Sequence, residues 1–375
     1  MPNPEATAAC PTLRNQFRVA ATSAELAQFR RAAWQFYQPA APVGVAGFGE
    51  VRWLRPGLTF TPFANAVRCN AHCAFCSEEL VRHEGHHLTA KRLIDDYPRY
   101  FARLREVLAP LRGFPLGLSL SGLEATAEPQ WLRGLLACLT AAEAEGVVFD
   151  EKVLYTNGSG LATSPDLILA LADFHLTRLE LSRCHPDAER NQHIMRFNRN
   201  QPIRHAAVYA NTVRRLHEHL TVRNSCILTR AGVATLPQIE EYLAWAAELG
   251  VRQVVFRELS RLEGSYLSNV FTDWIEANRV PIEPLLTAVL PRLEAPRPGW
   301  EYLGSTFGYY YYNEHYRWQG VEVVLETSSY PALQAATATG IIQKLVFHSD
   351  GTLSGDWDPA SQVLCQPVAA DCRTM

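Results

Sequence analysis

Three cysteines, Cys69, Cys73 and Cys76, are the residues of this 375-residue chain whose type and spacing most clearly suggest chemistry. They form the pattern C-x3-C-x2-C directly after a β-rich run, so we expect them on a loop at the end of a strand. Three thiolates on one short loop suit an iron–sulfur cluster. A [4Fe–4S] cluster normally takes four cysteines, so three would leave one iron with an open position.

Zinc is the alternative metal for these thiolates. Three cysteines and a histidine such as His72 or His83 would complete a tetrahedral zinc site. The stretch His83–His87 also matches H-E-x-x-H, the motif of zinc proteases, which needs a helix to bring both histidines to one face. Here Gly85 lies inside the motif, and Thr89 is expected to cap a helix that begins only afterwards. We favour the cluster and keep a zinc-binding protein or hydrolase as the alternative.

The cysteine loop needs a scaffold, and the sequence predicts one from residue 56 onward, where short β-rich runs alternate with helical runs. The predicted strands are 58–66, 116–121, 152–156, 178–182, 220–228 and 253–258, and the predicted helices are 90–108, 129–145, 165–174, 203–219 and 237–249. This alternation predicts an α/β fold with a parallel sheet, open or partly closed. Ligands of such sheets bind at the carboxyl ends of the strands, where the cysteine loop is expected.

Three regions are predicted: an N-terminal tail with a helical lead-in over 1–49, a barrel core over 50–262, and a mixed α+β extension over 263–375 that packs on the barrel. The lead-in contains a predicted helix at 23–37. In the extension, we expect helix over 271–293 and strands at 321–326 and 344–348. The turn chemistry of Ser349–Thr352 predicts a hairpin after the last of these strands.

Composition narrows the classes of protein that this chain can be. A hydrophobic share of 47% with only 19% charged residues excludes a largely disordered chain. The formal charge of −3 argues against a basic nucleic-acid surface. We find no apolar run of membrane-spanning length and no secretory signal, so we expect a cytoplasmic protein with no membrane partner. Its nine cysteines are then expected as reduced thiols or metal ligands.

Over about residues 55–260, the chain resembles the radical S-adenosylmethionine (SAM) superfamily, through the C-x3-C-x2-C pattern with Phe75 before its last cysteine. The resemblance implies a partial (β/α)6 TIM-like barrel with a [4Fe–4S] cluster on Cys69, Cys73 and Cys76. It implies that SAM binds the open iron and that its reductive cleavage gives a 5′-deoxyadenosyl radical, which abstracts a substrate hydrogen. It also implies an electron donor such as flavodoxin or ferredoxin.

The resemblance extends to further positions that would contact SAM. Gly122 and Glu124 match a Gly-Gly-Glu-Pro motif that contacts the methionine amino group in the family, whereas Leu123 and Ala125 depart from it. Matching positions for other cofactor contacts are Phe75, Thr156, Asn157, Ser182, Arg183, Asn224 and Phe256. The two departures leave a non-catalytic iron–sulfur barrel as a further alternative.

Substrate contacts are expected from the long loop after the fourth predicted strand, because long loops on this edge often carry function. The candidates are His185, Asp187, Asn191, Arg196 and, from a tyrosine run in the extension, Tyr310. Cys365 and Cys372 form only C-x6-C, too few ligands for a second cluster. We expect a small-molecule or peptide substrate, tailored by epimerisation, dehydrogenation, elimination or carbon–carbon bond formation.

Overall fold

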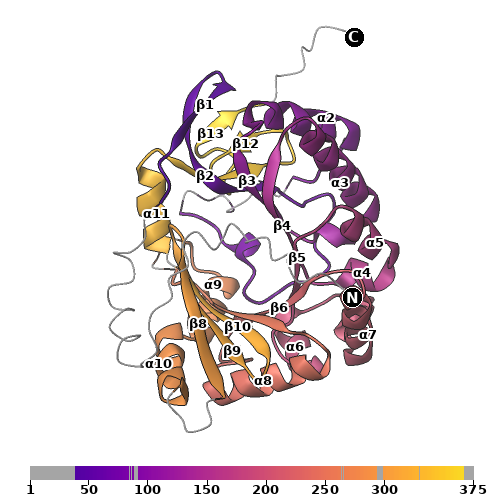
Figure 1. The fold of residues 1–375 in the computed structure, drawn as a ribbon, viewed down its shortest axis with the longest axis vertical. Helices are drawn as coiled ribbons and strands as arrows, with labels where there is room; N and C mark the ends of the chain where they lie inside the picture. Colours follow the sequence, from indigo (N-terminus) through magenta and orange to yellow (C-terminus); the bar gives the residue numbers. More distant parts are fainter. Residues whose placement is uncertain are drawn as a thin grey trace, which may run out of the picture.

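The computed structural model describes residues 39–83, 85, 87, 92–262, 264, 266–293, 299–328 and 330–366. The helix expected at 23–37 lies outside these residues, as do Glu84, His86, Thr89 and Cys372. The described strands form one curved sheet, and most of the helices that connect its parallel strands lie on its outer side (Figure 1). None of the described helices is both long enough and apolar enough to cross a membrane.

Six parallel strands form the centre of the sheet and follow one another in chain order. They are β2 (Glu50–Pro62), β3 (Pro115–Leu120), β4 (Val148–Thr156), β5 (Arg178–Ser182), β6 (Val222–Leu228) and β7 (Gln253–Glu258). Each overlaps a predicted strand, so the α/β fold with a partial barrel of six β/α units is confirmed. β2 begins earlier than expected, because its first half pairs antiparallel with β1 (Val43–Phe48), a strand in the region predicted as tail and lead-in.

Helices connect these strands on the outside of the barrel. They are α2 (Tyr97–Leu108), α3 (Pro129–Ala144), α4 (Ser159–Thr163), α5 (Asp166–Asp173), α6 (Ala188–Met195), α7 (Ala206–His217) and α8 (Leu236–Glu248). α2 begins at Tyr97 and not near residue 90, because the Asp96 side chain accepts a hydrogen bond from Arg99 N at 2.9 Å. Pro98 in its first turn favours the same start.

The extension lengthens the barrel sheet at both edges. Beside β7 lies β10 (Val321–Ser328), parallel to it and followed by the antiparallel strands β9 (Tyr311–Trp318) and β8 (Trp300–Phe307). Beside β2 lies β11 (Ile342–Phe347), also parallel, followed by β12 (Leu353–Ser354) and β13 (Val363–Cys365). The predicted hairpin at 349–352 is therefore confirmed. The order of the described strands ends at β13 and β8, so the barrel is open.

Helices α9 (Val270–Asn278), α10 (Ile282–Leu293) and α11 (Tyr330–Ala338) complete the extension. The first two together cover the helical region expected over 271–293. The break between them falls just before Ile282, next to Pro281, as expected for a residue that cannot continue a helix.

Alternation along the strands decides what faces the barrel interior. In β3, Leu116, Leu118 and Leu120 are buried in the core that also contains Leu104 of α2 and Leu132 of α3. Gly117 and Ser119, which lie between them, point the other way, and the Ser119 hydroxyl lies 3.0 Å from that of Ser121, just after the strand. The apolar face of β3 thus packs against the helices, while its polar face lines the barrel interior.

Candidate functional site

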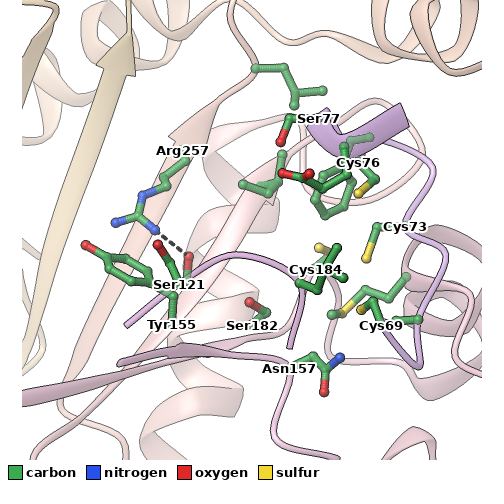
Figure 2. A pocket seen from close by; sticks show the side chains of 18 of the residues that line it. Cys69, Cys73, Cys76, Ser77, Ser121, Tyr155, Asn157, Ser182, Cys184 and Arg257 are labelled. Atoms are coloured by element: carbon green, nitrogen blue, oxygen red, sulfur yellow. Dashed lines mark hydrogen bonds between the residues drawn. The ribbon is translucent and has the colours of Figure 1, made fainter. Parts of the chain in front are cut away.

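A pocket of about 420 Å³ lies at the carboxyl ends of the parallel strands and contains the predicted cysteine triplet. Cys69, Cys73 and Cys76 form one side of it, while Tyr155 and Arg257 lie across from them (Figure 2). The wall also includes Phe75, Gly122, Glu124, Thr156, Asn157, Ser182, Ser225, Glu258, Leu262 and Ile275. Strand ends β3 to β7 therefore each contribute to the pocket that the cysteine loop borders.

The cysteine loop is held in place by backbone hydrogen bonds that it donates to the segment that ends α6. His72 N donates to Arg196 O at 3.1 Å, and Ala74 N donates to Ile194 O at 2.9 Å. Arg196 adopts a left-handed conformation with φ of 52°, which ends α6 and turns the chain alongside the loop. The 183–197 segment therefore supports the cysteines, a function that the sequence did not reveal.

The side chains expected to contact substrate do not line this pocket. Asp187 caps α6 by accepting from Arg190 N at 2.8 Å, and His185 Nδ1 accepts from Asp187 N at 2.9 Å. Asn191 Oδ1 accepts from Cys184 N at 2.9 Å. Neither these three residues nor Arg196 and Tyr310 are among the described residues that form the pocket wall. Their placement gives no support to substrate contacts by these side chains.

The donor set of the pocket fits an iron–sulfur cluster. Burial, with Glu124 as a second cause, raises the pKa of Cys69 to about 12, and burial also raises the pKa of Cys73. Iron bound here would therefore have to displace the protons of these thiols. Each cysteine of a [4Fe–4S] cluster binds its own iron, so thiols spread along one wall meet its requirement. Cys184 adds a fourth thiol to the same wall.

The described part of the chain contains no group of three His, Cys, Asp or Glu side chains placed to hold a single metal ion. Within the H-E-x-x-H stretch, His83 lies in a turn and His87 pairs with Val81 in an antiparallel bridge. Neither residue is on the helix that the protease motif requires.

Glu124 joins two strand ends beneath the pocket. It is 4% exposed, and its Oε1 accepts from Thr126 N at 3.0 Å, Thr126 Oγ1 at 2.7 Å and Thr156 Oγ1 at 2.6 Å. Oε2 accepts from Asn157 N at 2.7 Å. Burial raises the pKa of Glu124, while the bonds from Thr126 and Thr156 oppose that shift. Three predicted cofactor residues, Glu124, Thr156 and Asn157, are thus brought together.

Gly122 permits the close approach of the β3 end to the segment after β2. Its φ is +134°, and a Cβ built on it would lie 2.5 Å from Ala64 N. Ala64 N donates to Ser121 O, and Leu123 N donates to Ala64 O, both at 2.8 Å. Glycine is therefore required here for backbone contact next to the cysteine loop.

We expect Gly122→Ala to lower the free energy of unfolding by about 3 kcal/mol, from the clash and the unfavourable φ together. Chemical denaturation of the variant and of wild type measures the difference. Gly250→Ala is the matched control: Gly250 also has a positive φ of +82°, but a Cβ added there would meet no atom within 4 Å. Equal losses in the two variants would show that conformation alone, and not the contact with Ala64, requires glycine.

Three further predicted cofactor residues face away from the pocket. Arg183 lies against Tyr209, with the guanidinium carbon 4.7 Å from the ring centroid. Asn224 Oδ1 accepts from Tyr209 OH at 3.0 Å. The Phe256 ring packs edge-on against Tyr242 of α8. The pocket instead takes the alternate residues Ser225 and Arg257. We therefore no longer assign cofactor contacts to the side chains of Arg183, Asn224 and Phe256.

A buried charge network lies deeper in the barrel, next to Arg257. Glu180 is 1% exposed and pairs with Arg257 at 2.7 Å, Arg178 at 3.2 Å and Arg223. Arg257 also bonds Glu326 at 2.7 Å and the Ser225 hydroxyl at 3.0 Å. Burial alone would raise the pKa of Glu180, but the three arginines lower it to about 2.

Removing this carboxylate leaves three arginines without their shared partner, so we expect Glu180→Gln to cost roughly 3 kcal/mol of stability near neutral pH. A lowered pKa stabilises the fold above the unfolded value of about 4.3, and the gain is lost as the pH falls through the folded value. The difference between wild type and variant should therefore shrink from pH 4.3 towards pH 2. Denaturation at pH 7 and pH 3 measures it, with the exposed Glu241→Gln as control. A difference independent of pH would contradict the assignment to charge.

Glu258, which sequence analysis did not single out, is a further acid of the pocket wall. Burial raises its pKa to about 7, against the lowering effect of its ion pair with Arg279. Its position at the last residue of β7 was the signal that could have identified it. The site thus combines thiols, hydroxyls and a carboxyl group whose pKa is raised by burial.

No family model matches this chain, and no curated protein matches it. Among solved structures, it is similar to Streptococcus suis SuiB bound to S-adenosylmethionine, with 14% identity over 57% of this chain and 43% of that one and a TM-score of 0.40. It is also similar to anSMEcpe with bound AdoMet, with 16% identity, 54% and 51% coverage and a TM-score of 0.40. This chain thus spans about half the length of these two structures or less.

A third similar structure is the coproporphyrinogen III oxidase HemN from Escherichia coli, which is described as a radical SAM enzyme. The identity is 14% over 76% of this chain and 74% of that chain, with a TM-score of 0.39.

Proposed function

We propose that this chain is a radical SAM enzyme that binds a [4Fe–4S] cluster through Cys69, Cys73 and Cys76. The observation that carries the proposal is the placement of the C-x3-C-x2-C loop, whose three cysteines all border one pocket at the carboxyl ends of a parallel barrel sheet. Cys69, Cys73 and Cys76 would hold the cluster, which together with SAM would supply radical chemistry at a C–H bond of the substrate.

The chain's own residues position the cofactors and exclude water. Backbone hydrogen bonds that the cysteine loop donates to Ile194 O and Arg196 O fix it in place, and Glu124 fixes the ends of β3 and β4 beside it. Ser182 and Asn157 border the same space and offer a hydroxyl and an amide for hydrogen bonds to a polar cofactor. Phe75, together with the apolar wall residues Leu262 and Ile275, limits the access of water.

We place the substrate on the side of the pocket that lies across from the cysteines. There Tyr155, Ser121 and Arg257 present two hydroxyls and one guanidinium (Figure 2). The Ser225 hydroxyl, bonded to Arg257, adds a third. The charge of Arg257 is already balanced by Glu180 and Glu326, so this surface favours a polar substrate of low net charge. We propose that the substrate is a small molecule or peptide, which is modified by epimerisation, dehydrogenation, elimination or carbon–carbon bond formation. The proposed electron donor is flavodoxin or ferredoxin, and the proposed compartment is the cytoplasm.

The proposal is tested under anaerobic conditions. The full chain is reconstituted with iron and sulfide, reduced and supplied with SAM, and 5′-deoxyadenosine is measured by mass spectrometry. Iron and sulfide bound in near-equal amounts, with formation of 5′-deoxyadenosine, are the expected results. Bound zinc without sulfide would overturn the proposal in favour of a zinc protein. An intact cluster that never cleaves SAM would favour a non-catalytic barrel.

A further inference from the structure

Lys344 is a half-buried amine on the polar face of the sheet. It lies in β11 opposite Thr59 of β2, which in turn lies opposite Gly117 of β3. The next residues along the first two strands, Leu345 and Phe60, point into the core beneath the helices, so Lys344 points the other way. Thr59 is exposed, so solvent reaches this part of the polar face.

The amine of Lys344 has neither a hydrogen bond nor an ion pair among the described residues. Nζ lies 5.0 Å from the ring centroid of Trp357. The nearby Asp356 carboxylate pairs instead with Arg82 at 3.4 Å, and Asp358 pairs with the same guanidinium at 3.8 Å. Nζ is not one of the enclosed nitrogen atoms that lack a partner, so this amine is accessible from the polar face.

The surroundings of Lys344 favour its uncharged form. Burial lowers the pKa of Lys344 to about 8; Asp356 opposes this shift and Arg82 adds to it. Thr59, which faces the amine from β2, is uncharged, so Arg82, Asp356 and Asp358 are the charges to consider here. An amine with this pKa is uncharged in a substantial fraction near neutral pH, and the uncharged amine is the nucleophile.

Residue type sets Lys344 apart from the other cations of this face. Only three of the 35 Lys and Arg residues of the chain are lysines, Lys91, Lys152 and Lys344. Deeper in the barrel, the cations that surround Glu180 are all arginines. A guanidinium keeps its charge, whereas a lysine amine can lose its proton and bond covalently to a carbonyl carbon.

We propose that Lys344 forms an imine with an uncharged aldehyde or ketone that has an apolar body. The neutral amine attacks the carbonyl carbon, a carbon–nitrogen double bond replaces the carbon–oxygen double bond, and both amine hydrogens leave with the oxygen as water. No electrons are gained or lost in this step, so it requires neither an oxidant nor a reductant.

The neighbours of the amine determine which carbonyl compound fits. The Trp357 ring offers an apolar surface to the body of the ligand. Once the amine has become a neutral imine, the charges of Asp356 and Asp358 exceed that of Arg82 by one negative charge. A second negative charge on the ligand would be repelled, so an uncharged compound is favoured.

Imine formation at Lys344 goes beyond the proposed function. Neither Lys344 nor Thr59 nor Trp357 is among the described residues that form the wall of the cysteine pocket. The reaction needs no cluster and no SAM. A chain that fails to cleave SAM can therefore still form the imine, and a chain that forms no imine can still cleave SAM.

The test uses the full chain, reconstituted anaerobically, with benzaldehyde as the probe and sodium cyanoborohydride to reduce the imine to a stable secondary amine. Chymotrypsin digestion and mass spectrometry then give the rate of modification at each lysine. Nα-acetyl-lysinamide in the same solution is the reference amine. Lys152 is the internal control, because it is bound to Glu143 at 2.8 Å and to Phe174 O at 3.1 Å.

We expect Lys344 to react at least about tenfold faster than Lys152 and than the reference amine near neutral pH, because an ordinary lysine has a pKa of about 10.4. The ratio to the reference amine should fall between about pH 8 and about pH 10.4, where the reference amine also loses its proton. A Lys344 that reacts no faster than the reference amine would overturn the proposal.

Two variants and a control test the contacts. Arg82→Gln removes the nearby cation and frees both aspartates for the ammonium, so it should raise the pKa of Lys344 and slow its modification at least about fivefold. Arg92→Gln is the control, because Arg92 is exposed and pairs only with Asp95. In Lys344→Arg, the rapid modification should disappear. Circular dichroism confirms that each variant is folded. An unchanged rate in Arg82→Gln, or rapid modification that persists in Lys344→Arg, contradicts the proposal.

A second probe tests the class of ligand. 4-Formylbenzoate has the same ring as benzaldehyde and carries one negative charge. Relative to the reference amine, we expect it to modify Lys344 more slowly than benzaldehyde does, because of the excess negative charge beside the imine. The reverse order would contradict the assignment of an uncharged ligand.

Discussion

Replacing Cys73 with alanine is expected to lower the formation of 5′-deoxyadenosine to less than about one thousandth of the wild-type rate. Cys73 lies in the middle of the triplet and borders the pocket between Cys69 and Cys76. Without its thiolate, a second iron lacks a protein ligand in addition to the open one, so the cluster should assemble poorly. Bound iron and sulfide per chain, the visible absorbance of the cluster and 5′-deoxyadenosine are measured on the same preparation.

Two other cysteines make this experiment specific. Cys138 is buried in α3 and does not border the pocket, so Cys138→Ala controls for the loss of any buried thiol. Cys184 borders the pocket, but the three-ligand assignment requires Cys184→Ala to keep iron, sulfide and activity. A cluster lost in Cys184→Ala and kept in Cys73→Ala would refute the ligand assignment. Loss in all three variants would point to general instability.

Local pattern was sufficient to predict the cysteine loop and the six central strands. The triplet follows β2, and the strands alternate with helices that begin at sequence-encoded caps such as Thr235 of α8, whose side chain pairs with Gln238 in a capping box. Such signals act over a few residues. The start of α2 was misjudged because Asp96 and Pro98 set it more strongly than the apolar pattern before them.

The failures in the site came from the direction of side chains. Arg183, Asn224 and Phe256 were chosen by motif position, but alternate residues of a strand point to opposite faces. The side chain of the next residue along a strand points to the pocket if its neighbour points to the helices, which is why Ser225 and Arg257 line the pocket instead. The register that decides this is set by pairing with neighbouring strands, and motif position alone does not contain it.

Contacts between distant segments could also not be predicted from the sequence. The pairing of β10 with β7 and of β11 with β2 brings the extension to both edges of the barrel. The support of the cysteine loop by Ile194 and Arg196 is likewise a backbone contact across more than a hundred residues of chain, and backbone donors and acceptors leave no mark in residue type. The hairpin after β11 was predictable because its turn is local.

Glu124→Gln is expected to reduce 5′-deoxyadenosine formation at least about a hundredfold and to cost about 2 kcal/mol of stability. Both oxygens of Glu124 accept from backbone N–H groups, Thr126 N at Oε1 and Asn157 N at Oε2. A glutamine must present its NH₂ group to one of these two donors. Neither backbone group can rotate away, so either orientation of the amide leaves a buried donor without an acceptor.

In Glu124→Gln, we expect the strand end with the unpaired N–H group to move away from the side chain. This movement would change the pocket, because Gly122 and Asn157, which flank the ends of β3 and β4, both border it.

Glu128→Gln is the matched control: Glu128 caps α3 by accepting from Gln130 N at 3.4 Å, and glutamine keeps one oxygen for that bond. Thermal melts and 5′-deoxyadenosine assays are made on both variants. Glu124→Asp tests the effect of side-chain length separately from that of charge, because it keeps the carboxylate but shortens the side chain. Wild-type stability and activity in Glu124→Gln would show that an amide can replace this carboxylate, and that Glu124 does not determine the pocket geometry.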